Sequence, residues 1–160
     1  MTTKFEFKVL TQLRETELMQ GMEAKHLKKM ASIATELRFE SNEIIYQKGM
    51  VGTAIYLIVS GEVVIETLVP GQGQVVMNKL GPGKFFGWSS LFPAERKMAW
   101  TRATQPTRVY AFNAVQLRDA FQADHTFEYA LVRRAGQAMI DRIKATRQHL
   151  TQMLEVGEIA

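Results

Sequence analysis

The sequence predicts an α+β fold, in which an antiparallel β-roll (jelly-roll-like) is flanked by N-terminal helices and a long C-terminal helix. Eight of the eleven glycines lie between residues 49 and 87, where short β-rich runs alternate with turn signals. Before and after the β-rich region, apolar residues recur at the spacing of amphipathic helices. With 160 residues, 46% of them hydrophobic, the chain can bury the core of one domain. We therefore expect a single domain over residues 1–160, with helices at 10–34, the roll at 35–112 and helices at 113–157.

The N-terminal block is predicted to form two short helices that pack against the rest of the domain. Gly21 interrupts the apolar pattern and divides it in two. The residues that carry this pattern are Leu10, Leu13, Leu18, Met22, Leu27, Met30 and Ile33.

The middle block is predicted to form short strands separated by tight turns. Gly61 and the Pro-Gly-Gln-Gly run at 70–73 mark two of these turns. Gly49, Gly52 and Gly61 are each expected to permit a positive φ. Residues 55–59 are apolar on both faces of their strand, which favours a central place in a sheet. The expected strands are 35–40, 44–47, 54–60, 62–68, 74–80 and 108–112.

The C-terminal block is predicted to form a short helix and then a long one. Asn113 can cap the first, which reaches residue 121 or 122, and Asp124 can cap the second, which is expected to end at Gly157. The long helix carries an apolar seam of three- and four-residue steps, which favours a homodimer through this helix. The same seam could instead pack on the roll of its own domain. The seam residues are Tyr129, Val132, Gly136, Met139, Ile143, Thr146, Leu150 and Met153.

Composition and motifs exclude several classes of protein. There is no cysteine, the three histidines lie far apart in the sequence, and neither a nucleophile elbow nor a Walker-type phosphate loop is present. We therefore expect no metal, no cofactor and no enzymatic activity. No apolar run is long enough for a membrane span, and the N-terminus lacks a signal-peptide core, which favours the cytoplasm. The net charge of +4 is compatible with an anionic ligand.

Glycines and apolar residues follow a recognisable order in the β-rich block. Residues 47–65 read QKGMVGTAIYLIVSGEVVI and residues 80–87 read LGPGKFFG, followed by LF at 91–92 and AWTRA at 99–103. These stretches closely resemble the cyclic nucleotide-binding domains of catabolite activator and FNR-type regulators. The resemblance extends from about residue 13 to the long helix. It implies a β-roll sensor that regulates by binding a ligand.

The resemblance places a phosphate-binding turn in the segment FFGWSSLFPAERK at 85–97. In the family an acidic residue after the glycine holds the ribose, two backbone amides hold the cyclic phosphate, and an arginine pairs with that phosphate. Backbone N–H groups at the start of a helical turn also bind anions on general grounds. The site residues expected from this mapping are Gly87, Trp88, Ser89, Ser90, Leu91, Arg96, Lys97, Met98 and, on the long helix, Arg142.

This chain departs from the family pattern at three of these positions. Trp88 stands where the acidic residue belongs, Lys97 falls on the arginine position with Arg96 one residue earlier, and Met98 replaces a small hydroxyl residue. A hydrogen bond to a charged group contributes roughly 1.5–3 kcal/mol, so losing the acidic group alone weakens ribose binding about tenfold or more. We therefore expect an altered pocket that takes an anionic small molecule with a flat or apolar part against Trp88. Alternatively, Trp88 is a plain core aromatic.

Other functions remain open at the level of sequence. The chain could be a genuine receptor for cyclic AMP or cyclic GMP, or a dimer that binds a protein partner without any small ligand. A β-roll enzyme of the cupin type lacks its metal-binding histidines here. Transcription factors that the chain resembles carry a helix-turn-helix domain after the long helix, and this sequence holds none. We therefore expect no direct contact with DNA.

Overall fold

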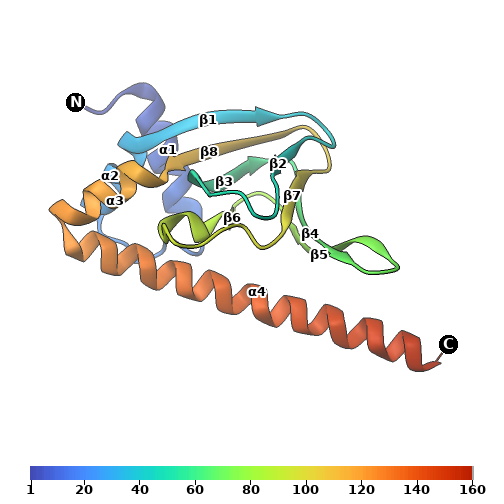
Figure 1. Ribbon diagram of the computed structural model, residues 1–160. Coiled ribbons are helices and arrows are strands. Elements are labelled where there is room, and N and C mark those ends of the chain that lie inside the picture. Colours follow the sequence, from blue (N-terminus) through green and yellow to red (C-terminus); the bar gives the residue numbers. More distant parts are fainter. Residues whose placement is uncertain (160) are drawn as a thin grey trace.

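The computed structural model shows a roll of two antiparallel sheets with helices at both ends of the chain (Figure 1). It describes the backbone of residues 1–159 and the side chains of residues 1–155. One sheet has the strand order β1-β8-β3-β6 and the other β2-β7-β4-β5. The strands are β1 (Ala34–Phe39), β2 (Ile44–Tyr46), β3 (Ala54–Ser60), β4 (Val63–Val69), β5 (Gly73–Leu80), β6 (Phe85–Phe86), β7 (Trp100–Ala103) and β8 (Thr107–Asn113). The predicted fold class is confirmed.

Strand β3 lies inside its sheet, as its two apolar faces predict. It pairs with β8 on one side and with β6 on the other, and its first five residues are buried. Strands β4 and β5 form a hairpin around the predicted turn at 70–73. The sequence did not predict β6 and β7, which are short and follow loops without alternating apolar residues.

The N-terminal block forms two helices, α1 (Lys4–Glu15) and α2 (Ala24–Ile33), on either side of Gly21. The first begins earlier than the apolar pattern indicated, because the hydroxyl oxygen of Thr3 accepts a hydrogen bond from the Glu6 amide and caps it. The pattern predicted a boundary near residue 10 because Thr2–Lys8 hold few buried side chains.

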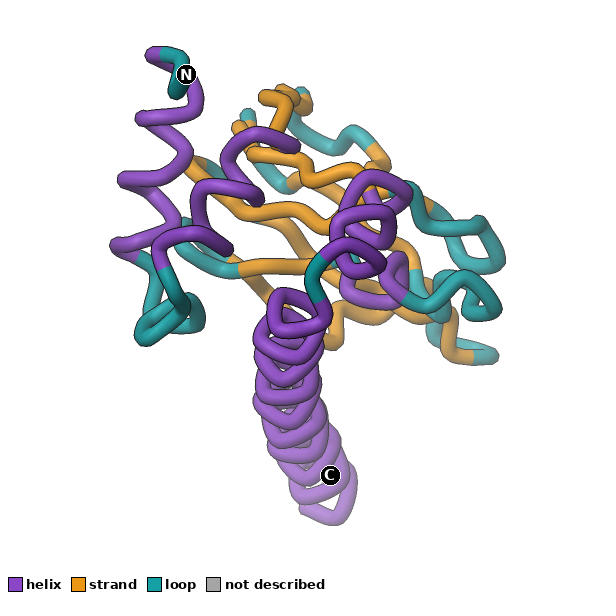
Figure 2. The backbone as a smooth tube through the Cα atoms, turned by 90° about the vertical axis from the view of Figure 1, so that its left-hand side faces the viewer, coloured by secondary structure: helices purple, strands orange, loops and turns teal. Residues whose placement is uncertain are grey.

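The C-terminal block forms α3 (Ala114–Ala123) and the long helix α4 (His125–Ile159). The Asn113 side chain accepts a hydrogen bond from the Gln116 amide, and Asp124 accepts one from the Thr126 amide, so both predicted caps are confirmed. The predicted end at Gly157 is wrong, since the helix continues through that residue to Ile159. A glycine lowers helix propensity without ending a helix that is already formed. Figure 2 shows the C-terminal half of α4 projecting away from the sheets.

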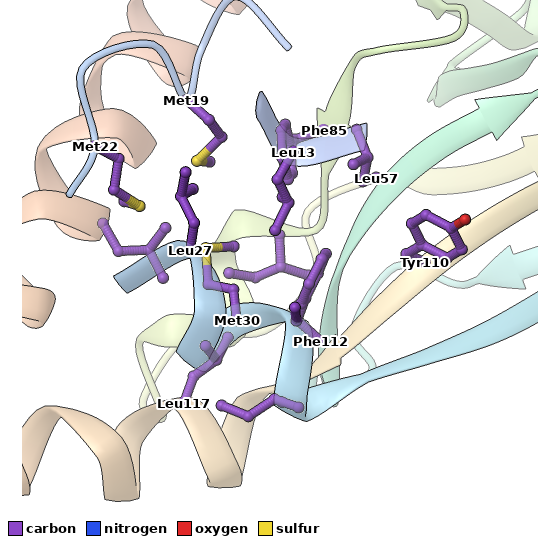
Figure 3. Close-up of a cluster of buried hydrophobic side chains, with 14 of the residues drawn as sticks. Leu13, Met19, Met22, Leu27, Met30, Leu57, Phe85, Tyr110, Phe112 and Leu117 are labelled. Carbon is purple, nitrogen blue, oxygen red and sulfur yellow. The ribbon is translucent and has the colours of Figure 1, made fainter. Parts of the chain in front are cut away.

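Two hydrophobic clusters divide the interior. The larger one joins the helices to one face of the β1-β8-β3-β6 sheet and contains Leu13, Met30, Phe112 and Leu117 (Figure 3). The smaller one lies between the sheets, around Tyr56 and Phe86, whose rings stack with centroids 4.8 Å apart. None of the helices that the structure describes is long and apolar enough to cross a bilayer.

Candidate functional site

The predicted phosphate turn is present as a single 3-10 turn, η1 (Trp88–Leu91), introduced by Gly87. Gly87 has a φ of 87°, and a Cβ at this position would lie 2.9 Å from the carbonyl oxygen of Ala54. Only glycine therefore fits here without strain. The Ser90 amide donates to the carbonyl oxygen of Gly87 at 3.1 Å. This amide was expected to face a ligand, and the structure corrects that expectation, because the turn itself uses the donor.

The side chain of Lys97 enters the turn and is almost wholly buried, with 5% of its surface exposed. Its ammonium group donates to the carbonyl oxygen of Gly87 at 3.2 Å and to the hydroxyl oxygen of Ser90 at 3.1 Å. The same nitrogen lies 4.4 Å from the centre of the Tyr46 ring, within the range of a cation–π interaction. Lys97 is thus held in one place by neutral groups.

Gly52 provides the space that Lys97 occupies. A Cβ on Gly52 would lie 2.1 Å from Oγ of Ser90 and 2.8 Å from Cε of Lys97. Unlike Gly49 and Gly61, Gly52 does not have a positive φ. The expectation of a left-handed backbone at Gly52 is therefore wrong, and the reason for glycine here is the close approach of two side chains.

Arg142 of α4 is the second cation of the site. Its side chain is half-buried and donates to the carbonyl oxygen of Phe85 at 3.2 Å. Burial, together with a smaller effect of the Arg142 charge, lowers the pKa of the Lys97 ammonium to about 8. Burial likewise lowers the pKa of Arg142. Among residues 1–155, no carboxylate lies within salt-bridge distance of either cation.

Two hydroxyl groups lie on the neighbouring strands β2 and β7. Tyr46 and Thr101 are partners in the register of these strands. Burial raises the pKa of Tyr46, so its hydroxyl stays neutral and can donate a hydrogen bond. The Thr101 hydroxyl is fully buried and has no partner among the described residues. The interior of the roll therefore offers polar hydrogen-bonding groups beside two cations, and no carboxylate of residues 1–155 forms a salt bridge with either cation.

The aromatic side chain of Trp88 turns away from this polar cluster. It is 1% exposed and belongs to the core between the helices and the roll, with its ring centroid 5.5 Å from that of Phe85. Leu91 packs into the same core. The sequence left open whether Trp88 is a core aromatic or lines a ligand pocket, and in the structure its indole lies in the core.

The other predicted residues lie nearer to solvent. Ser89 is half-buried in the turn, and Met98 is 82% exposed. Arg96 is exposed and donates to the carbonyl oxygen of Gly49 at 3.2 Å, so it holds a loop instead of facing the cluster. The structure thus brings together Gly87, Ser90, Lys97 and Arg142 and separates them from the remaining predicted site residues.

Sequence reasoning missed three residues that shape the site: Tyr46, Gly52 and Arg118. Arg118 of α3 donates to the carbonyl oxygen of Ser90 at 2.8 Å and ties the turn to the helix. Gly52 was visible as part of the run of glycines, although its role was misassigned. No local pattern marks Tyr46 or Arg118, because each reaches the turn from a distant element.

Comparison with known proteins identifies the family and the fold. The model of the family described as "Cyclic nucleotide-binding domain" matches residues 36–124. A Rhodopseudomonas palustris protein described as a potassium channel protein is 30% identical over 81 residues, which is 51% of this chain. The match spans only 19% of the length of that relative.

Two solved structures illustrate the shared fold. A cyclic nucleotide-binding domain from Methylobacillus flagellatus has a TM-score of 0.79 at 17% identity, covering 94% of this chain and 84% of that one. The c-di-GMP-responsive global regulator CLP from Xanthomonas campestris has a TM-score of 0.70 at 16% identity, covering 82% of this chain and 65% of that one. At these identities the likeness concerns the fold.

Proposed function

The chain belongs to the cyclic nucleotide-binding domain family, and from that premise we propose that it is a ligand-sensing regulatory module and not an enzyme. On this proposal its ligand carries an anionic group that binds between Lys97 of the roll and Arg142 of α4. The family and the regulatory fold support the general role.

One observation carries the proposal: two cations share the interior of the site without an acidic partner. A buried charge without a counterion is costly, and proteins usually pair such charges or neutralise them. Lys97 responds with a lowered pKa, and no described carboxylate lies close to it or to Arg142. An anion bound here would provide the missing charge, and the hydroxyl groups of Ser90 and Tyr46 would provide hydrogen bonds.

The same two cations suggest how binding would be transmitted. Lys97 is fixed to the turn η1, whereas Arg142 lies on α4 and contacts the roll through the Phe85 carbonyl. An anion that contacts both side chains would favour the position of α4 in which Arg142 stays against the roll. The ligand would shift the equilibrium between two positions of α4, with Arg142 against the roll or away from it. The size of the shift is set by the difference in ligand affinity between the two positions.

A thermal-shift screen tests this proposal. The panel contains cyclic AMP, cyclic GMP, c-di-GMP, inorganic phosphate and anionic metabolites, each at rising concentration. A one-site ligand at 100 times its dissociation constant adds about 2.7 kcal/mol to the free energy of unfolding. Stabilisation by at least one anion supports the proposal, and cyclic AMP or cyclic GMP as the best ligand would identify a genuine cyclic nucleotide receptor. Absence of any shift would favour a module without a small ligand.

We also propose that a second copy of the chain covers the outer face of α4. Side chains at heptad spacing on this helix are exposed in the single chain: Ile143 is 60% and Leu150 50% exposed. Ile140 and Leu154 extend the same stripe, with 48% and 61% exposed. The seam predicted from sequence has two parts. Val132, Met139 and Thr146 are half-buried against their own domain, whereas Ile143 and Leu150 face solvent. A parallel pair of α4 helices, one from each copy, would bury this exposed stripe.

A further inference from the structure

A cleft of about 910 Å³ lies on the outer side of Arg142, between α4 and the roll. Its walls come from the middle of α4, from β5 and the turn after it, and from the segment after α1. Neither Lys97 nor any residue of the turn η1 lines it. The volume lies within the range of small-molecule sites, which is about 300–1,000 Å³. The cleft is therefore large enough for a ligand of its own.

Five cations and two acids surround the cleft. The cations are Lys79, Lys84, Arg133, Arg134 and Arg142, and the acids are Glu17 and Asp141. Within the part of the chain whose side chains the structure describes, none of these seven forms a salt bridge. A concave surface lined by one sign of charge concentrates ions of the opposite sign. The cleft therefore attracts anions.

The same cleft has apolar surfaces beside its charges. Leu18, Met77, Leu80 and Ala138 are half-buried there, and Phe85 is 4% exposed. Half-buried apolar side chains leave surface that a ligand could cover, and each Å² of apolar surface removed from water contributes to binding. Cationic and apolar groups in one cleft match a ligand that has both an anionic head and an apolar body.

Hydrogen bonds between α4 and the rest of the domain flank the cleft. Arg134 donates to the carbonyl oxygen of Gln20 at 3.0 Å, and Arg142 donates to that of Phe85 at 3.2 Å. Both arginines also line the cleft. The Nε atom of Arg134 is buried without a hydrogen-bond partner among the described residues. A ligand in the cleft would contact the side chains that hold α4 in place.

We propose that this cleft between α4, β5 and the turn after β5 is a second binding site, which takes an amphipathic anion such as an aromatic sulfonate or a fatty carboxylate. The cleft borders the anion position at Lys97 through Arg142, and its other lining residues belong to the cleft alone. The proposal predicts that the two sites respond to different substitutions.

The test uses 1-anilinonaphthalene-8-sulfonate, which becomes fluorescent in apolar surroundings, as the probe. Titration of the full chain should show saturable binding at one site, and laurate should displace the probe. The neutral analogue N-phenyl-1-naphthylamine has the same rings without the sulfonate, and it should bind about five- to tenfold more weakly or worse, because it forgoes the attraction of partly exposed cations. Equal binding of both probes, or no saturable binding, would overturn the proposal.

Two pairs of variants locate the probe. Lys84→Gln with Arg133→Gln removes two exposed cations of the cleft, whereas Lys28→Gln with Arg147→Gln removes two exposed cations outside it. Ala145→Phe narrows the cleft from an exposed position on α4, and Gln148→Phe adds the same ring one turn away, outside the cleft. Only the two cleft variants, Lys84→Gln with Arg133→Gln and Ala145→Phe, should raise the dissociation constant of the probe, by about five- to tenfold. The two control variants should leave it unchanged.

Two results of these comparisons would contradict the proposal. Equal effects within a pair would mean that the probe responds to net charge or to surface rings in general. An effect of Lys97→Met as large as that of the cleft variants would mean that the probe occupies the interior of the roll. Because all four cations of the paired variants and both positions on α4 are exposed, every paired variant is expected to fold.

Discussion

The ammonium nitrogen of Lys97 lies 3.1 Å from the hydroxyl oxygen of Ser90, inside the turn that the family resemblance assigns to phosphate binding. The chain thus places one of its own cations where its polar groups converge, and Arg142 of α4 adds a second positive charge nearby. On the proposal above, these two cations hold the anionic group of the ligand. The buried Lys97 and the exposed Arg96 are neighbours in the sequence, and their substitution should affect anion binding very differently.

Replacement of Lys97 by methionine should weaken anion binding strongly, whereas replacement of Arg96 by methionine should leave it nearly unchanged. Lys97 is buried in the site, and Arg96 is exposed and contacts the Gly49 carbonyl. A charged hydrogen bond is worth roughly 1.5–3 kcal/mol, so the loss at Lys97 should be about ten- to a hundredfold. Isothermal titration calorimetry with the best anion of the screen measures both variants. Similar losses in the two would show that only net charge matters.

Anion affinity should fall as the pH rises above 8. The pKa of Lys97 is lowered to about 8 in the free protein, so the ammonium group loses its proton in this range. A bound anion favours the charged form, which means that binding takes up one proton above pH 8 and weakens about tenfold for each further pH unit. Calorimetry between pH 7 and 10 measures this, with a ligand that does not titrate there.

Lys97→Arg provides the control for the pH dependence. An arginine stays charged throughout this range, so the affinity of that variant should be constant between pH 7 and 10. An unchanged pH dependence in Lys97→Arg would assign the titration to another group.

Substitution of Gly52 by alanine should destabilise the domain and weaken anion binding together. The added Cβ would lie 2.1 Å from Oγ of Ser90 and 2.8 Å from Cε of Lys97, so both side chains must move. Overpacking of this kind costs about 1–3 kcal/mol. Gly81→Ala is the matched control, because a Cβ there meets no atom within 4 Å. Denaturant unfolding should therefore give a lower free energy of unfolding for Gly52→Ala than for Gly81→Ala. Equal values for the two variants would contradict the close packing of Ser90 and Lys97 around Gly52.

Trp88 should behave as a core residue in mutational tests. Trp88→Ala is expected to cost about 3–5 kcal/mol in the free energy of unfolding, as is usual for a buried aromatic side chain. Trp88→Phe should cost less, because it keeps an aromatic ring and removes an N–H group that has no described partner. Trp88→Glu would bury a carboxylate in an apolar core and should unfold the domain instead of restoring a ribose contact. A stable Trp88→Glu variant with tighter cyclic nucleotide binding would refute this assignment.

The oligomeric state should depend on the exposed stripe of α4. Ile143→Glu combined with Leu150→Glu places charges on the face proposed to pair with a second copy, and it should convert a dimer to a monomer. Gln148→Glu changes the charge of an exposed position on the same helix and should leave the dimer intact. Light scattering coupled to size-exclusion chromatography measures the mass. A wild-type monomer at high concentration would remove the dimer proposal.

Much of the architecture follows from local patterns in the sequence. Strand β3 has the predicted bounds, Ala54–Ser60, because a short apolar run between two turns marks a buried strand without help from distant residues. The cap at Asn113 is equally local, since the capping oxygen and the amide of Gln116 are three residues apart. Strands β6 and β7 escaped prediction because their pairing depends on partners elsewhere in the chain.

The sequence by itself determined that this chain forms a glycine-punctuated roll between helices, with a tight turn that begins at Gly87. Only the tertiary structure decided that Trp88 faces the helical core, that Lys97 faces the interior of the roll, and that Arg142 comes close to it. Side-chain direction in a short turn depends on which cavity the neighbouring elements leave open. Those elements, α1, α2, β2 and α4, are separated from the turn by long stretches of chain, so no local pattern in the segment 85–97 encodes the outcome.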